Sequence, residues 1–187
     1  MRLNQFSAGL VAIVAAFALN SAQAAEPGST PTAPTGYFGL MGGLGLASFS
    51  KDGISSSTTA FEYGLHMGYD FAPDFSVGVY GLTYAFSSVT SGGITFPNPI
   101  ATRIWNFGLE GDYRFPEMVG LHAGIKVGIE TADVTGSATD FVFGPQVGYD
   151  FHFCDALSIG PVVDYMFDLK TNRTNMFDAV ADVKYHF

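Results

Sequence analysis

The most regular pattern in the chain is the alternation of apolar and mostly polar positions over residues 175–187, which end the sequence. One face comprises Phe177, Ala179, Ala181, Val183, Tyr185 and Phe187. The opposite face comprises Met176, Asp178, Val180, Asp182, Lys184 and His186. A period of two predicts a β-strand, and its length suits a tilted strand that crosses a bilayer. A soluble β-sandwich, whose strands also alternate, is the main rival interpretation.

The same alternating pattern recurs in five earlier segments, and the number of such segments bears on the choice between a membrane barrel and a soluble β-sandwich. These segments are residues 61–71, 105–115, 121–129, 141–153 and 157–170. In each, aromatic and aliphatic residues hold one face, while Gly, Asp, Glu, Lys or His are frequent on the other. Together with the terminal segment they predict six clear strands.

Two further strands are weaker. Residues 37–49 are rich in glycine, and Phe38, Leu40, Leu44 and Leu46 are expected to point outward. Residues 75–86 change phase near Tyr80, where a β-bulge could reset the register. Eight antiparallel strands close the smallest membrane barrel. The sequence therefore predicts an all-β fold, an eight-stranded antiparallel up-and-down transmembrane β-barrel.

The predicted connections fall into two classes. The tight turns are residues 71–74, 116–119 and 154–156. The mostly longer loops, rich in Ser, Thr, Gly and Asn, are residues 50–58, 87–101, 132–139 and 171–174. Short turns are typical of the periplasmic side of such barrels and longer loops of the outside.

Aromatic residues gather near the strand ends that adjoin the tight turns. They are Tyr69, Phe71, Phe75, Tyr113, Phe115, Tyr149, Phe151, Phe153, Tyr185 and Phe187. We interpret them as a periplasmic aromatic girdle. Stability is then expected from this girdle, from a closed ring of backbone hydrogen bonds and from charge pairing in the interior, without an apolar core.

The N-terminus has the features of a cleaved secretory signal peptide. Arg2 precedes an apolar stretch at residues 6–19, and Ala22 and Ala24 supply the small residues of a cleavage site. We therefore predict a signal peptide at residues 1–24, a flexible periplasmic lead-in at 25–36 and the barrel at 37–187.

The predicted mature chain is acidic, because loss of Arg2 makes it one unit more negative than the formal charge of −9 of the whole chain. An acidic chain does not favour nucleic acid as a partner. The single cysteine, Cys154, cannot form an internal disulfide.

Charged residues concentrate on the face that the barrel would turn inward. The inward carboxylates are Glu62, Asp70, Glu110, Asp112, Glu130, Asp150, Asp164, Asp168, Asp178 and Asp182. The inward basic side chains are Arg114, Lys126, Lys184, His66, His122, His152 and His186. Buried charges must pair or be hydrated, so we predict a hydrogen-bonded polar network that fills an acidic lumen. The alternative is a narrow pathway that prefers cations.

Inward glycines recur four positions apart and bear on this choice. The pairs are Gly64 and Gly68, Gly124 and Gly128, and Gly144 and Gly148. Each leaves space that a neighbouring side chain or water could occupy, and the pattern does not decide which. A lumen filled with side chains is usual at this barrel size.

The histidines test the hypothesis of a lipid-modifying enzyme, which would need a histidine beside a serine or carboxylate. Three of them, His122, His152 and His186, fall at the periplasmic strand ends, and His66 lies deeper. None lies at the outer rim, where lipopolysaccharide would be presented. We predict no enzyme, no catalytic or cofactor-binding residue, no metal site and no cofactor.

The whole predicted mature chain resembles the small eight-stranded outer-membrane β-barrel proteins of Gram-negative bacteria. The resemblance rests on the signal peptide, the eight alternating strands and the terminal Val183, Tyr185 and Phe187. It implies that these three residues form the C-terminal assembly signal for the outer-membrane insertion machinery. It also implies an outer-membrane location, with membrane lipid and lipopolysaccharide as surroundings, for which we predict a monomer. The resemblance indicates a porin-like superfamily, and it does not identify a substrate.

The second external loop is apolar at residues 94–100 and lies just beyond Arg103 and Trp105. It is either an ordered loop tip or a contact surface for a ligand or phage. The sequence therefore favours a structural or surface-exposed outer-membrane protein. A narrow porin-like channel for small solutes or cations is the alternative, and a lipid-modifying enzyme is disfavoured.

Overall fold

The protein was analysed as a computed structural model. It describes residues 36–51, 54–86, 88–91, 94–97, 103–132, 139–169 and 173–187. The predicted signal peptide and all but the last residue of the predicted lead-in lie outside this part, so both remain predictions. Within the described residues, no helix is long and apolar enough to span a membrane.

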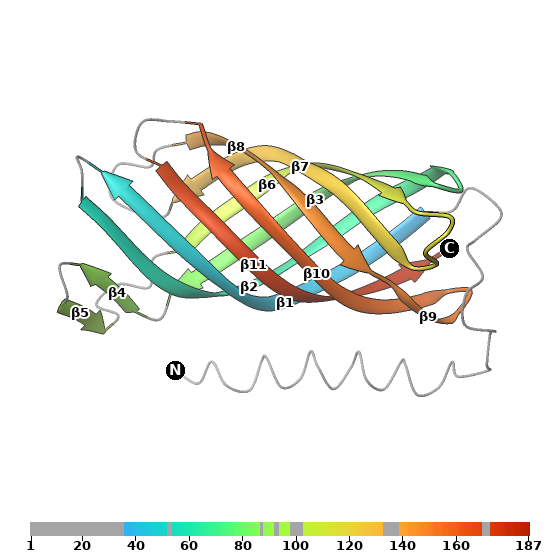
Figure 1. The fold of residues 1–187 in the computed structure, drawn as a ribbon, viewed down its shortest axis with the longest axis horizontal. Helices are drawn as coiled ribbons and strands as arrows, with labels where there is room; N and C mark the ends of the chain where they lie inside the picture. The colour runs from blue at the N-terminus through green and yellow to red at the C-terminus, as the bar shows by residue number, and fades with distance from the viewer. Residues whose placement is uncertain are drawn as a thin grey trace.

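The described strands form a closed antiparallel barrel of tilted strands (Figure 1). Eight strands form its wall: β1 (Gly36–Lys51), β2 (Ile54–Ala72), β3 (Phe75–Phe86), β6 (Arg103–Arg114), β7 (Leu121–Ala132), β8 (Thr139–Tyr149), β10 (Leu157–Asp168) and β11 (Arg173–His186). The short strand β9 (Phe151–Cys154) continues β8. The ring closes because β1 pairs with both β2 and β11. The predicted fold class is therefore confirmed.

The two ends of the barrel differ, as the sequence predicted. At the turn end, the connections are short, and Phe187 and Gly36 exchange two backbone hydrogen bonds of 2.9 Å. At the loop end lie β4 (Ser88–Ser91) and β5 (Ile94–Pro97), which pair as a hairpin (Figure 1). The hairpin joins the wall through Ser57 of β2, opposite Thr90.

The predicted loop at residues 50–58 is wrong. Strands β1 and β2 continue to pair as far as Lys51 opposite Ile54. The serines and threonines in this stretch are typical of a loop by composition, but the two strands stay paired through them, as in Ser50 opposite Ser55. The predicted loop at 87–101 likewise contains the β4–β5 hairpin.

One wall strand is interrupted at the turn end. Strand β8 ends at Tyr149 and β9 begins at Phe151, and the register with β10 shifts between Leu157 and Ser158. The Asp150 amide donates to the Gly120 carbonyl at 2.8 Å. Gly120 has a φ of 92°, a left-handed conformation that favours glycine. This turn therefore sets the depth of the Asp150 side chain in the lumen.

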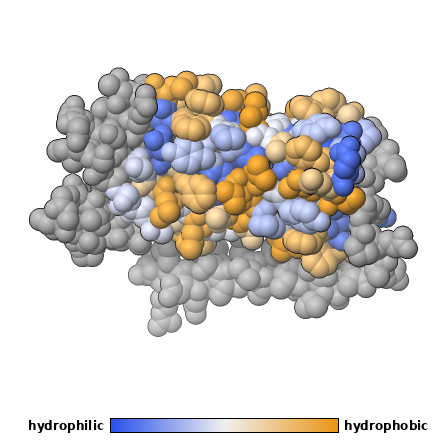
Figure 2. Space-filling view, viewed as in Figure 1, coloured by the Kyte–Doolittle hydropathy of each residue, from blue (hydrophilic) through white to orange (hydrophobic). Residues whose placement is uncertain are grey.

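The outer wall is apolar, and Figure 2 shows apolar side chains over much of the visible face, among weakly polar ones. Leu44, Leu109 and Ile125 are exposed by 61%, 59% and 61%. Nine of the ten predicted girdle residues are also exposed, and Phe115 is half-buried. Their rings meet in pairs, such as Phe71 with Phe75 at 4.9 Å between centroids. Such a surface is stable in lipid rather than in water.

Strand β3 keeps one phase, so the predicted bulge at Tyr80 is wrong. Its register with β2 and β6 is continuous through Tyr80. The inward residues of β3 are Ser76, Gly78, Tyr80, Leu82, Tyr84 and Phe86. The apparent change of phase arises because the inward face itself becomes apolar toward the loop end.

This apolar part of the interior corrects the expectation of a barrel without a core. Side chains from seven strands form a buried apolar cluster, and we call six of its members in the half of the lumen nearer the loops the apolar plug. They are Leu82, Tyr84, Ile104, Val142, Met166 and Met176, each at most 3% exposed. The prediction was wrong because apolar inward residues share strands with charged ones, as Met166 does with Asp164 and Asp168 on β10.

Candidate functional site

The candidate site is the lumen, where the structure places the predicted polar residues. All ten inward carboxylates are buried, at 0–8% exposure. Lys126, Lys184, His66, His122 and His186 are buried as well. Arg114 and His152, nearer the turn end, are half-buried. The alternation of strand residues thus sorted the charges correctly between wall and interior.

A chain of ion pairs crosses the lumen in the half nearer the turns. We call Glu110, His66, Asp182, Lys184 and Asp150 the ionic network. His66 Nδ1 lies 2.7 Å from Glu110 Oε1, and its Nε2 lies 3.0 Å from Asp182 Oδ1. Lys184 Nζ then reaches Asp182 at 3.4 Å and Asp150 at 2.9 Å. Because these five residues come from different walls of the barrel, the network ties the walls together across the interior.

Other interior groups are paired locally. The Arg114 guanidinium donates to Asp70 at 2.6 Å, and the Gln146 amide donates to Asp112 at 2.7 Å. Lys126, at the middle of the barrel, donates to Asp164 at 2.6 Å. A buried lysine is stable only with such a partner.

Tyrosines supply part of the lumen that the sequence analysis left out. The Tyr37 hydroxyl donates to Glu110 at 2.9 Å, and the Tyr80 hydroxyl donates to Asn106 at 3.1 Å. The Lys126 ammonium lies 5.6 Å from the Tyr80 ring centroid, within cation–π range. Tyr37 could have been assigned to the lumen by counting back in steps of two along β1.

Side chains from other strands occupy the spaces beside several of the inward glycines, whereas Gly144 faces the backbone of β10. A Cβ at Gly68 would collide with the Tyr37 hydroxyl, and one at Gly128 with the Tyr80 hydroxyl. A Cβ at Gly148 would meet the His122 ring. These glycines therefore make room for large inward side chains, which answers the question that their spacing left open.

The histidines do not gather at one point. The rings of His152 and His186 lie 5.9 Å apart, while His122 faces Asp150 at 3.6 Å. Ser158 Oγ lies 3.1 Å from His186 Nε2, and His186 Nδ1 lies 4.0 Å from Asp70. These groups have the residue types of a hydrolase triad. However, the 4.0 Å from His186 to Asp70 is too long for a hydrogen bond. Ser158 is also 0% exposed, so its hydroxyl is not accessible to a substrate.

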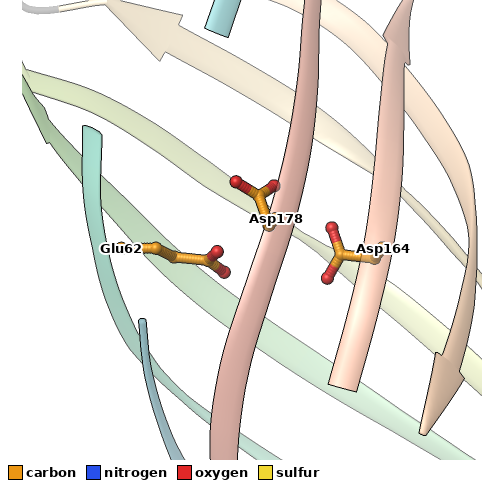
Figure 3. Close-up of side chains that lie close together, drawn as sticks. All are labelled: Glu62, Asp164 and Asp178. Atoms are coloured by element: carbon orange, nitrogen blue, oxygen red, sulfur yellow. The ribbon is translucent and has the colours of Figure 1, made fainter. Parts of the chain in front are cut away.

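A group of three carboxylates at the middle of the lumen was not singled out by the sequence. Glu62 of β2, Asp164 of β10 and Asp178 of β11 place carboxylate oxygens within 4.8 Å of one another (Figure 3). Asp164 and Asp178 are direct register partners. Glu62 approaches them from the far side of β1. No periodicity within one strand could have shown this approach.

Comparison with protein families decides the classification. The family profile described as the outer membrane protein beta-barrel domain matches residues 12–187. The chain belongs to this family. As a family member with a closed barrel and an apolar wall, it is a transmembrane β-barrel of the bacterial outer membrane, as predicted. A comparison with curated proteins finds no significant match.

Several solved structures share the fold of this protein, although their sequences are at most 18% identical to it. Neisserial surface protein A is 14% identical, with a TM-score of 0.61, covering 83% of this chain and 99% of that one. OprG from Pseudomonas aeruginosa is 18% identical, with a TM-score of 0.51, covering 81% and 96%. Ail of Yersinia pestis, solved in complex with the heparin analogue sucrose octasulfate, is 14% identical, with a TM-score of 0.50, covering 80% and 99%.

Proposed function

We propose that this protein is a non-conducting, non-enzymatic barrel that serves the outer membrane as a structural or surface-exposed component. The carrying observation is that two layers obstruct its lumen. The apolar plug fills much of the loop half, and the ionic network crosses the turn half. A barrel closed by both layers offers no continuous water path for a solute.

The alternative is a narrow pathway for cations, and the charge balance favours it. Ten buried carboxylates face only three lysine or arginine side chains, so the interior attracts cations and repels anions. Attraction alone does not give conduction. An ion would have to displace Met166, Met176 and Tyr84, which are at most 1% exposed.

Planar-bilayer conductance separates the two functions. We expect no discrete steps from the wild-type protein, and the same silence from Glu110→Gln and Asp164→Asn. Asp155→Asn, which removes the same charge from an exposed residue of a turn, is the matched control. Cation-selective steps that fall in the first two variants but not in the control would establish the channel instead.

A surface contact is a second proposed role, supported by the position of the β4–β5 hairpin. The hairpin lies beyond the wall at the loop end, and its sequence contains the apolar Ile94 and Phe96 (Figure 1). Ail, a structural neighbour, was solved with a heparin analogue bound, although the likeness extends to the fold alone. Deleting residues 94–99 is expected to reduce binding of a surface ligand or phage while insertion continues. Undiminished binding would contradict this role.

The absence of catalysis is also a proposal, and its support is the state of His66. Both ring nitrogens of His66 face carboxylate oxygens, and no serine hydrogen bond to the ring is found within the described residues. A histidine engaged at both nitrogens has no free position for proton transfer to a substrate. We expect the mass of lipid A to be unchanged when the protein is overexpressed. A mass change that His66→Ala abolishes would revive the enzyme.

The assembly signal remains a proposal for Val183, Tyr185 and Phe187. The Tyr185 and Phe187 side chains are exposed by 54% and 72% on the outer wall, while Val183 is half-buried. Their place on the closing strand β11 suits recognition before β1 has paired with it. Phe187→Ala should slow insertion into the outer membrane in cells while leaving refolding in detergent intact. Equal insertion of the variant and the wild type would count against the signal.

A further inference from the structure

The three central carboxylates are poorly compensated by their surroundings. Glu62, Asp164 and Asp178 are at most 2% exposed, so bulk water does not screen them. Lys126 donates to Asp164 at 2.6 Å, and the Tyr84 hydroxyl donates to Asp178 at 3.1 Å. As three carboxylates and one ammonium, the group would carry two unbalanced negative charges. Directly paired like charges such as Asp164 and Asp178 destabilise a sheet.

Glu62 is the decisive residue of the group. It is 0% exposed, and neither of its carboxylate oxygens has a hydrogen-bond donor among the residues that the structure describes. One oxygen of Asp164 and one of Asp178 also lack a donor. Figure 3 shows the three carboxylates close together on separate strands, with Glu62 and Asp164 extending toward one another from opposite sides. Four buried oxygens of this one group thus lack donors in the described part of the chain, which is rare in folded proteins unless another group satisfies them.

Strand β1 is built to permit this convergence. It lies between β2 and β11, and its inward residues at this level are Gly43 and Gly45. A Cβ at Gly45 would collide with Oδ1 of Asp178, and one at Gly43 with the backbone of β11. Because β1 presents no side chain here, Glu62 can reach across it to the pair on the other side.

We propose that Glu62, Asp164 and Asp178 bind one hard divalent cation, of the Ca²⁺ or Mg²⁺ class, inside the barrel. The donor set is oxygen only, which suits these ions and not the softer transition metals. Oxygens within 4.8 Å of one another can contact one ion at the usual Ca²⁺–oxygen distances of about 2.3–2.6 Å. The ion cancels the two unbalanced charges. It acts as an internal crosslink between β2, β10 and β11, the strands on either side of the seam at β1.

A shared proton is the competing account. A proton held between Glu62 and Asp178, or between Asp164 and Asp178, would let one carboxyl group donate to another. The two accounts differ in what they respond to. A cation site responds to Ca²⁺ at constant pH, whereas a shared proton responds to pH at constant Ca²⁺.

Equilibrium dialysis with radioactive Ca²⁺ tests the site on the whole protein, refolded in an uncharged detergent with the ion already present, because the obstructed lumen would hinder entry of an ion after folding. We expect one ion per chain, with excess Mg²⁺ as a competitor that shows which ion is preferred. Glu62→Gln removes a direct ligand and should weaken Ca²⁺ binding by at least about 10- to 100-fold, the loss that is typical when a residue supporting a metal ligand is removed. Glu130→Gln is the matched control, because Glu130 is a lumen glutamate at 5% exposure outside the group. Binding by wild type that Glu62→Gln leaves unchanged, or that both variants lose equally, would overturn the proposal.

Unfolding by denaturant gives a second test that does not depend on the variant folding well. Ca²⁺ should raise the unfolding midpoint of the wild type above its value in a chelator at the same pH. In the chelator, Glu62→Gln should be at least as stable as the wild type, because the substitution removes repulsion. In Ca²⁺, the order should reverse. A wild-type midpoint that shifts with pH but not with Ca²⁺ would establish the shared proton and refute the cation site.

Discussion

The two halves of the lumen solve the same packing problem with different chemistry. Toward the loops, the interior is largely filled by the apolar plug, with Glu130 of β7 and Asp168 of β10 buried beside it. Toward the turns, it is filled by the ionic network and by locally paired groups such as Arg114 with Asp70. Both halves are buried within one closed barrel, so the difference lies in the side chains alone.

The difference teaches that an apolar wall does not require a polar lumen throughout. An apolar interior gains from dispersion and from exclusion of water, and it tolerates small changes of shape. A network of charges gains little net stability, yet loss of one partner leaves the other buried and unpaired. The turn half should therefore be the more sensitive to single charge changes, and the loop half to lost volume.

The largest effect is expected where a buried charge loses its partner. Lys126→Met removes the donor to Asp164 and should lower the free energy of unfolding by about 3–5 kcal/mol. Denaturant titration in detergent micelles measures this loss. The double variant Lys126→Met, Asp164→Leu removes both charges and should recover much of it. A single variant as stable as the wild type would show that the lumen is hydrated.

A volume change in the apolar plug should cost nearly as much. Leu82 is 0% exposed, and Leu82→Ala should lower the free energy of unfolding by about 2–5 kcal/mol because a cavity remains. Leu44→Ala is the matched control, since Leu44 is 61% exposed on the wall and detergent fills the vacated space. An equal loss of unfolding free energy in Leu82→Ala and Leu44→Ala would contradict the assignment of Leu82 to a packed interior and of Leu44 to the outer wall.

A charge placed on the wall sharpens the contrast with the partnered charges inside. Val163 is 40% exposed on β10, and Val163→Arg should cost about 2–4 kcal/mol near the membrane midplane. Phe153→Arg, in the girdle, is expected to cost less, because charge is tolerated near the interface. Refolding into lipid vesicles measures both. If Val163→Arg refolds unchanged, the assignment of faces is wrong.

The smallest effect concerns the turn that positions Asp150. Gly120 has a φ of 92°, and Gly120→Ala should cost about 1–2 kcal/mol through strain at a left-handed position. Gly111→Ala is the control, since a Cβ there meets only the Ser76 carbonyl oxygen at 3.8 Å. Thermal or denaturant unfolding that ranks Gly111→Ala as the more damaging change would contradict the account of this turn.

Much of the fold followed from the sequence because strand periodicity reports which face a residue occupies. That rule placed the ten carboxylates inside and the girdle aromatics outside, as the structure finds. It did not report which residues meet across the lumen, because such contacts depend on the closure of β1 against β11. The approach of Glu62 to Asp178 is of this kind.

Other features were missed because the pattern was judged by polarity alone. Leu82, Tyr84 and Phe86 lie on the inward face of β3, which becomes apolar toward the loops, so this part of the interior looked like a change of phase in β3. Likewise, the polar residues near Lys51 and Ile54 concealed two long paired strands. In both cases backbone pairing, which composition does not encode, determined the outcome.

The most direct test of the central claim is the environment of the methionine methyl groups, observed by nuclear magnetic resonance in lipid nanodiscs. Met67 is 48% exposed on the wall and Met118 is 60% exposed in a turn, whereas Met41, Met166 and Met176 lie in the lumen at 1–5% exposure. A lipid-soluble paramagnetic probe should broaden Met67, and a water-soluble probe should broaden Met118. The three lumen methyl groups should stay sharp with both probes. Broadening of Met166 and Met176 by the water-soluble probe would show an open, hydrated lumen and contradict the account.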